Sequence, residues 1–198
     1  MTPPLLIAVY FTGLIVASAI RLVYTREYRD RVRKEGKRPR VDTPLVYLPA
    51  LGFFIIPLVY VLTPLLSFAD YTLPFTAGLA GTAVYALALW LLWRSHADLG
   101  RYFSPVVEVI EGQRLVTDGI YRRIRHPMYT AHLLWGLAQP LLLWNWVAGF
   151  ALLATVIPLM LVRIPAEERV MREQFGSEYA EYMARTGRLL PARGKKSG

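Results

Sequence analysis

Long apolar blocks without charge alternate with short basic segments along this chain of 198 residues. Charged side chains are absent from residues 1–20, 43–69 and 71–93. A bilayer core requires roughly 20 apolar residues for each helical span, so every block is long enough to cross once. The pattern predicts three membrane helices, at about residues 4–23, 44–66 and 74–93.

A fourth apolar block covers residues 127–162 and has no ionised side chain if His132 is neutral. As one helix it would be about 54 Å long, whereas the hydrocarbon core is only about 30 Å thick. We therefore expect two short helices that fold back as a hairpin, at about residues 128–144 and 146–162, with the turn at Trp144-Asn145-Trp146. The predicted fold is an all-α integral membrane protein with five transmembrane helices in a single domain.

The composition agrees with this prediction. Hydrophobic residues make up 55% of the chain and charged residues 19%, which is more apolar than a typical soluble domain. The absence of cysteine excludes disulfides, thiolate metal sites and a cysteine nucleophile. The histidines His96, His126 and His132 lack the spacing of a metal site, so no bound metal is expected.

Positive charge gathers in three segments. The net charge is +9, and all 23 lysines and arginines fall within residues 21–40, 94–125 and 163–196. Five spans place these segments on one side of the membrane, and the positive-inside rule makes that side the cytoplasm. The amino terminus and the turns near Asp70 and Asn145 are then outside, and the carboxyl terminus is inside. This distribution predicts contact with membrane lipids and argues against a nucleic-acid partner.

Two further features bear on location. The tripeptide Ala17-Ser18-Ala19 is similar to a signal-peptidase site, but no basic residue precedes it and the apolar run is too long for a signal-peptide core. We therefore expect a retained first span. The excess of 19 arginines over four lysines is typical of a GC-rich prokaryotic genome, and hence indicates a prokaryotic cell membrane.

The basic segment 94–125 is too rich in glycine and proline for one long helix, and it leads into the run Gly-Ile-Tyr-Arg-Arg-Ile-Arg-His-Pro-Met-Tyr at residues 119–129. Pro127 stands where a helix can begin, because the first helical position needs no N–H partner. The free N–H groups of that helix start favour a carboxylate, and His126 is placed to add a donor. A basic anchor before a membrane helix explains the same run without a site.

A second run, Arg163-Ile164-Pro165-Ala166-Glu167-Glu168, follows the last predicted span. Neighbouring helical residues do not share a face, so at most one of Glu167 and Glu168 can point into a pocket. In a purely structural interpretation, Arg163 reaches lipid headgroups and the glutamates favour the start of a new helix that Pro165 opens.

The two runs together are more specific than either alone. Arg125-His126-Pro127, a hairpin, Arg163-Ile164 with Glu167-Glu168, and then Phe175-Gly176 resemble the isoprenylcysteine carboxyl methyltransferase family, over about residues 96–191. Ala131 departs from the family pattern, which has glycine there, but alanine is also small enough for close helix packing. The resemblance implies an S-adenosylmethionine-dependent enzyme that methylates the carboxylate of an isoprenylcysteine-like or other lipid-linked substrate at the membrane.

The resemblance also implies roles for particular residues. Arg163 is expected to bind the substrate, and Arg163 and Glu167 are expected to be the catalytic residues. The residues expected to bind S-adenosylmethionine, at the cytoplasmic ends of the last two spans, are Gln113, Arg114, Leu115, Val116, Tyr121, His126, Pro127, Met128, Tyr129 and Glu167. Tyr121 and Leu115 are suited to enclose adenine, and the helix start with His126 to hold the methionine carboxylate.

Other classes of function stay open. A membrane N-methyltransferase acting on an amine, such as a phospholipid headgroup, would need a base to remove the ammonium proton, and Arg163 would repel that substrate. A related membrane reductase would need further basic groups to bind the phosphate of NADPH. A membrane module without enzymatic activity would share the predicted fold as well.

Overall fold

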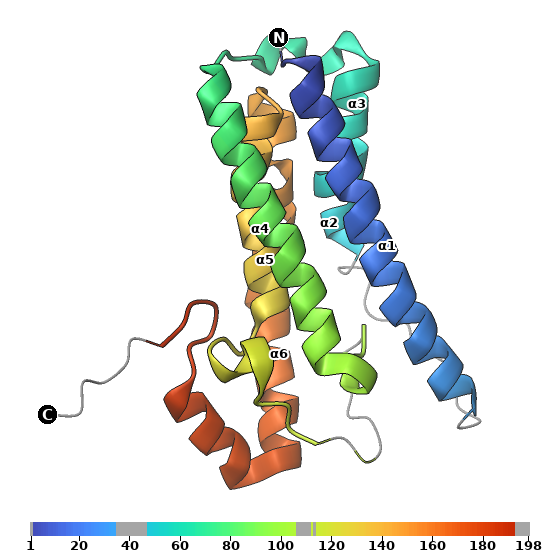
Figure 1. The fold of residues 1–198 in the computed structure, drawn as a ribbon, viewed down its shortest axis with the longest axis vertical. Helices are drawn as coiled ribbons and strands as arrows, with labels where there is room; N and C mark the ends of the chain where they lie inside the picture. The colour runs from blue at the N-terminus through green and yellow to red at the C-terminus, as the bar shows by residue number, and fades with distance from the viewer. Residues whose placement is uncertain (1, 35–46, 106–111, 113, 193–198) are drawn as a thin grey trace, which may run out of the picture.

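The computed structural model describes residues 2–34, 47–105, 112 and 114–192. Within these ranges the secondary structure is helical, and β-type pairing is limited to two isolated bridges. The prediction of an all-α chain is confirmed. Figure 1 shows an elongated bundle in which the long helices run roughly side by side.

Among the described residues, three helices are long and apolar enough to cross a membrane, as expected of a membrane protein: α1 (Pro4–Lys34), α4 (Phe75–Leu99) and α6 (Trp146–Arg185). Two shorter apolar stretches accompany them, namely α5 (Pro127–Leu142) and a stretch made of α2 (Leu48–Ala50), the π-helix η2 (Leu51–Ile55) and α3 (Ile56–Leu62). The remaining elements are the 3₁₀ helices η3 (Pro64–Ala69), η4 (Gly100–Tyr102) and η5 (Gly119–Arg122).

The first helix is longer than the span predicted for it. α1 continues past residue 23 to Lys34, where the sequence suggested a basic linker. Tyr28 and Val32 on this extension pack against Phe103, and Arg31 donates a hydrogen bond to the Phe103 carbonyl at 3.1 Å. The basic end of α1 thus has an apolar face of its own, so the helix need not end where the apolar sequence ends.

Neighbouring helices compensate for a proline in the second apolar stretch. Pro57 has no N–H, which leaves carbonyls one turn earlier without a helical donor. The Tyr10 hydroxyl on α1 donates to the Phe53 carbonyl at 2.7 Å. The Gln139 amide on α5 donates to the Gly52 carbonyl at 2.9 Å. Both freed carbonyls are therefore satisfied inside the bundle.

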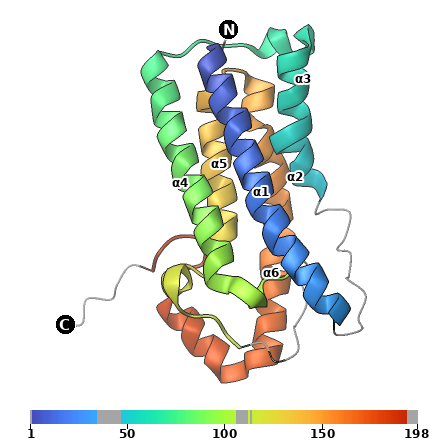
Figure 2. The ribbon, with the colours of Figure 1, turned by 45° about the vertical axis from the view of Figure 1, so that its right-hand side comes forward.

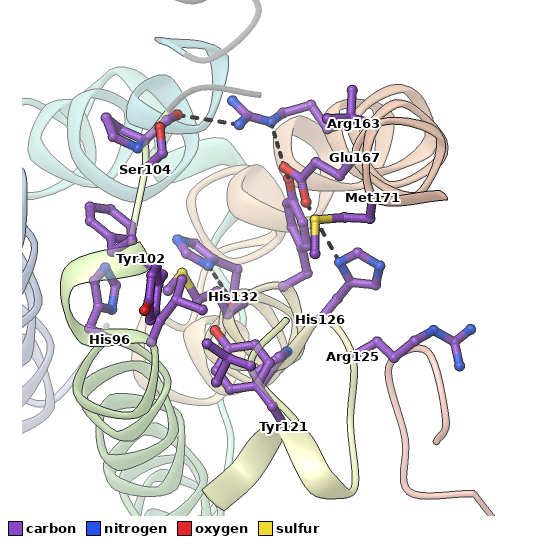
Figure 3. Close-up of a pocket in the computed structure, with 18 of the residues that line it drawn as sticks. His96, Tyr102, Ser104, Tyr121, Arg125, His126, His132, Arg163, Glu167 and Met171 are labelled. Carbon is purple, nitrogen blue, oxygen red and sulfur yellow. Dashed lines mark hydrogen bonds and ion pairs between the residues drawn. The ribbon is translucent and has the colours of Figure 1, made fainter. Parts of the chain in front are cut away.

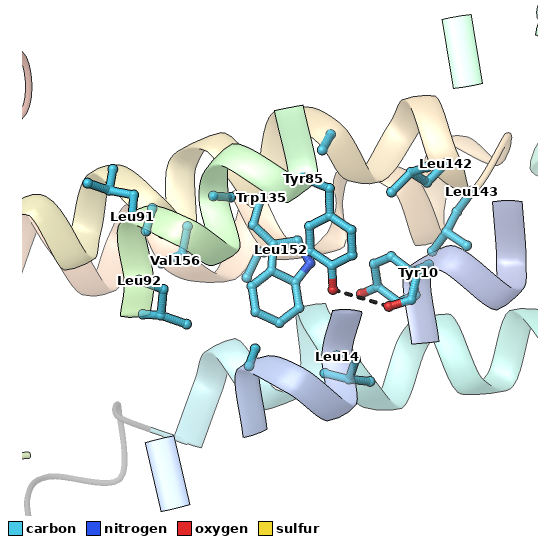
Figure 4. Close-up of a cluster of buried hydrophobic side chains, with 14 of the residues drawn as sticks. Tyr10, Leu14, Tyr85, Leu91, Leu92, Trp135, Leu142, Leu143, Leu152 and Val156 are labelled. Carbon is cyan, nitrogen blue, oxygen red and sulfur yellow. Dashed lines mark hydrogen bonds between the residues drawn. The ribbon is translucent and has the colours of Figure 1, made fainter. Parts of the chain in front are cut away.

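The core lies between α1, α4, α5 and α6, as Figure 4 shows. The rings of Tyr10 and Tyr85 stack with their centroids 5.8 Å apart, and the Tyr85 hydroxyl donates to the Tyr10 carbonyl at 3.1 Å. A Cβ atom at Gly13 would overlap the Tyr85 ring, so glycine there permits the close approach of α1 and α4. Trp135 on α5 packs against the same ring, which joins three helices.

One end of the bundle is tied together through Asn145, in the short connection between α5 and α6. Its side-chain oxygen accepts from the N–H groups of Val147 and Ala148, and its amide donates to Asp70 at 2.8 Å. The amino terminus lies at this end in Figures 1 and 2. The described residues of the three basic segments lie toward the opposite end, which we call the basic end.

α6 runs through Pro165 without interruption, so the expectation that Pro165 opens a new helix was wrong. The backbone leaves the helical conformation later, at Gly176, where φ is 51° and glycine is favoured. Figure 1 shows the chain turning back below the bundle after this point. The turn brings Tyr179 and Tyr182 against Leu115, where both tyrosines are buried.

Candidate active site

A cavity of about 440 Å³ lies at the basic end of the bundle. Every predicted site residue within the described ranges lines it (Figure 3). These residues are Arg114, Leu115, Val116, Tyr121, His126, Pro127, Met128, Tyr129, Arg163 and Glu167. Gln113 lies outside the described residues. The fold therefore brings the two sequence runs to one place, across the connection between α5 and α6.

Glu167 is the centre of the polar contacts in this cavity. Its Oε1 accepts hydrogen bonds from the Tyr129 hydroxyl at 2.7 Å and from Arg163 Nε at 3.3 Å. Its Oε2 lies 3.6 Å from Nδ1 of His126. Burial by itself raises the pKa of Glu167, but the hydrogen bonds and the nearby positive charges outweigh burial and lower the pKa. Glu167 is therefore an anion at neutral pH.

His126 links the two adjacent glutamates. Its Nε2 lies 3.3 Å from Oε1 of Glu168, while Nδ1 faces Glu167. Burial lowers the pKa of His126, but hydrogen bonds to the two carboxylates outweigh burial and raise the pKa, which favours the imidazolium. Both ring nitrogens thus face protein carboxylates, whereas the sequence analysis expected a free donor. The N–H groups in the first turn of α5, those of Met128 and Tyr129, stay available to an anion.

Glu168 points away from the cavity. Its side chain is only 3% exposed, and its carboxylate lies 2.6 Å from Arg188 Nη2 and 3.4 Å from Arg125 Nε. The hydrogen bond from His126 and the Arg188 guanidinium lower the pKa of Glu168 to about 2, against the effect of burial. Of the two glutamates only Glu167 lines the cavity. The prediction that one helix face carries only one of them is confirmed.

The segment after α6 holds the start of α5 in place. The N–H groups of Arg125 and His126 donate to the carbonyls of Gly187 and Arg188, at 2.9 and 3.0 Å. The Thr130 hydroxyl donates to the next carbonyl, that of Leu189, at 2.7 Å. The position of His126 therefore depends on the carboxyl-terminal part of the chain. No local motif predicts this contact, because it arises only from the turn at Gly176.

Aromatic side chains form another wall of the cavity. Tyr121 is buried, and its carbonyl accepts a hydrogen bond from the Tyr182 hydroxyl at 2.7 Å. Tyr179 and Tyr182 also line the cavity, next to Leu115. These apolar surfaces suit a flat aromatic ligand such as adenine.

Arg163 faces the cavity from α6. Besides Glu167, its guanidinium contacts the backbone of the loop after α4, where Nη2 donates to the Pro105 carbonyl at 3.3 Å. Figure 3 shows the side chain spanning the cavity wall between these partners. The guanidinium therefore belongs to the cavity, in contrast to the interpretation that it only reaches lipid headgroups.

Several cavity residues were missed by the sequence analysis because they belong to no motif. Arg21 reaches the cavity from α1, His96 from α4 and His132 from α5. The only signal for Arg21 was its position as a charge at the end of an apolar block. The histidines were considered only as metal ligands, and the described part of the chain contains no group of three or more side chains that could hold a metal ion.

Comparison with known proteins finds similarity to one family. Residues 79–173 match the sequence model of the isoprenylcysteine carboxyl methyltransferase family. Over this segment, just under half of its length, the chain is similar to this family. The predicted resemblance to this family of methyltransferases is confirmed. The match begins earlier than residue 96, within α4, and ends before Phe175-Gly176.

Individual relatives carry the same description. Protein-S-isoprenylcysteine O-methyltransferase B of Arabidopsis thaliana is 33% identical over 94 residues, which are 46% of this chain and 48% of that protein. A probable protein-S-isoprenylcysteine O-methyltransferase of Oryza sativa subsp. indica is 27% identical over 183 residues, 89% of this chain and 94% of the rice protein. The Schizosaccharomyces pombe protein-S-isoprenylcysteine O-methyltransferase is 32% identical over 114 residues, 56% of this chain and 48% of the yeast protein.

The chain thus matches about half the length of the Arabidopsis and yeast proteins and nearly all of the rice protein. The rice match also covers most of this chain, so similarity extends beyond the motifs that the sequence analysis used. All three relatives are eukaryotic and give no support to the predicted prokaryotic origin.

Proposed function

We propose that this chain is an integral membrane enzyme that transfers a methyl group from S-adenosylmethionine to the carboxylate of an isoprenylcysteine-like or other lipid-linked acid. The observation that carries the proposal is the position of Arg163 beside Glu167, in one cavity with the helix start at Pro127. A fixed cation for the acceptor and a fixed anion for the methyl donor therefore lie next to each other. The names of the family and of the relatives support the same reaction.

S-adenosylmethionine fits the residues of this cavity. The volume of about 440 Å³ is within the range of roughly 300–1,000 Å³ found for small-molecule pockets. Tyr121 and Leu115 offer apolar surfaces to the adenine, and Glu167 can accept from ribose hydroxyls or face the positive sulfonium. The N–H groups of Met128 and Tyr129 suit the methionine carboxylate.

When bound, this cofactor supplies an electrophilic methyl group on a positively charged sulfur. The chain need not supply a general base, because a carboxylate acceptor is already an anion at neutral pH. Arg163 holds one edge of that carboxylate and leaves the other oxygen free to attack the methyl group. Holding the reacting atoms about 3–3.5 Å apart and in line removes several kcal/mol from the barrier. Glu167 orients Arg163 for this task through their 3.3 Å contact.

Transfer of a labelled methyl group tests the proposed reaction. Purified protein is incubated with labelled S-adenosylmethionine and three acceptors: an S-prenylated cysteine, its carboxamide, and a phospholipid with a primary amine. We expect label on the free acid only, in a base-labile ester. Label on the amine would support the alternative N-methyltransferase instead, and binding of NADPH without binding of S-adenosylmethionine would support the reductase.

We further propose five spans with the basic end in the cytoplasm. The chain has no cysteine, so single-cysteine variants report sidedness directly. Ser67 lies at the Asn145 end of the bundle and Arg101 at the basic end, and both are exposed. An impermeant thiol reagent added outside intact cells should label Ser67→Cys and not Arg101→Cys. Labelling of both variants from the same side would contradict the topology.

A further inference from the structure

Arg21 faces the cavity from α1, outside the segment that matches the family. Its side chain is exposed, and within the described part of the chain it forms neither a hydrogen bond nor an ion pair. Arg163, in contrast, is paired with Glu167. Arg21 therefore contributes positive charge to the cavity that no carboxylate of the described residues compensates.

The two histidines near Arg21 do not neutralise its guanidinium. His96 and His132 lie within its electrostatic range and line the same cavity. The Nδ1 atom of each ring contacts a carbonyl of its own helix, Leu92 at 2.8 Å and Met128 at 2.7 Å. A carbonyl only accepts, so Nδ1 carries the proton and Nε2 of each neutral ring is an acceptor. Such acceptors can orient a guanidinium and leave its charge intact.

Arg163 is also within electrostatic range of Arg21. Two guanidiniums near one apolar cavity repel each other, and an unpaired charge in a region of low dielectric is costly. An anion that contacts both guanidiniums would reduce both penalties. Arg21 belongs to α1 and Arg163 to α6, so an anion bound by both would contact one arginine from each helix.

We infer that Arg21 is a second binding residue for the carboxylate of the acceptor, acting together with Arg163. This inference rests on the proposed function, in which the acceptor is a lipid-linked acid. Each carboxylate oxygen has two lone pairs, so contacts from two arginines still leave a lone pair for the methyl group. α1 then forms part of the acceptor site, and the charge of the acceptor, rather than its lipid chain alone, determines binding.

The test compares an S-prenylated cysteine with its methyl ester, which lacks the negative charge and has one additional methyl group. Binding of both is measured by calorimetry with S-adenosylhomocysteine present, so that no turnover occurs. The variant Arg21→Gln should bind the acid about ten- to a hundredfold more weakly, as expected for loss of one charge-assisted contact. Its affinities for the ester and for S-adenosylmethionine should stay within about twofold of the wild type.

The matched control is Arg26→Gln, since Arg26 is exposed on the same helix and does not line the cavity. It should bind the acid like the wild type. Arg21→Lys keeps the charge and should lose less than Arg21→Gln, which guards against a folding defect. Equal losses of affinity for the acid and the ester would show that Arg21 has a packing role. Equal affinities of Arg21→Gln and Arg26→Gln for the acid would show that Arg21 only contacts lipid headgroups. Either result overturns the inference. Failure of the wild type to methylate any acid would refute the proposed function while these binding measurements still decide the role of Arg21.

Discussion

Replacing Arg163 by lysine is expected to slow methyl transfer by roughly tenfold to a thousandfold, which corresponds to about 1.4–4 kcal/mol. Lysine keeps the positive charge but loses the planar guanidinium that can hold a carboxylate by one edge. Alignment of the reacting oxygen should therefore fail, while general attraction of the acid persists. Single-turnover methylation measures the rate, and calorimetry measures the affinity for S-adenosylmethionine, which should stay nearly unchanged.

The contact between Arg163 and Glu167 makes the second measurement necessary. If Glu167 binds the cofactor, disturbing its partner could also weaken cofactor binding. A parallel loss of affinity and rate would assign Arg163 to the cofactor site, and full activity of Arg163→Lys would remove it from the mechanism. Arg169→Lys is the matched control, because Arg169 is exposed on the same helix and should tolerate lysine.

The positions of the helices could be predicted from the sequence only where burial in the membrane determines them. Runs without charge located the apolar parts of α1, α4 and α6. They did not locate the helix ends, because a helix can continue beyond the apolar run wherever a neighbour offers packing. Tyr28 provides this packing in α1 through its contact with Phe103. Likewise, proline is favoured at a helix start but does not require one, and Pro165 lies inside α6.

The site could be predicted where its residues occur in compact motifs. His126 and Glu167 belong to two short runs, and the connection between α5 and α6 brings these runs together. Arg188 and Arg21 belong to no run. Arg188 reaches Glu168 only because the backbone turns at Gly176, and Arg21 reaches the cavity only because of the way α1 packs on the bundle. Contacts of this kind depend on tertiary structure, which a single sequence does not specify locally.

The largest effect on stability is expected at Glu168. Its carboxylate is buried and contacts Arg125, Arg188 and the His126 ring. Glu168→Ala would leave the guanidinium of Arg125, whose side chain is only 10% exposed, without its carboxylate. Removing one partner of a largely buried pair in this way costs about 3–5 kcal/mol. Thermal unfolding in detergent should show the loss. Glu173→Ala, an exposed change on the same helix, should unfold like the wild type.

The dependence of this effect on pH follows from two pKa values that move in opposite directions. The pKa of Glu168 is lowered to about 2 from its usual 4.5, so its contribution to stability is present above pH 4.5 and is lost as the pH falls toward 2. The pKa of His126 is raised above its usual 6.5, so its contribution is complete below pH 6.5 and is lost as the pH rises through the folded-state value. The difference in stability between wild type and Glu168→Ala should therefore be largest between about pH 4.5 and 6.5. Glu167→Ala, in contrast, should mainly weaken binding of S-adenosylmethionine, since Glu167 faces the cavity and its side chain is 25% exposed. A stability difference for Glu168→Ala that does not change across this pH range would contradict the assignment of these ion pairs.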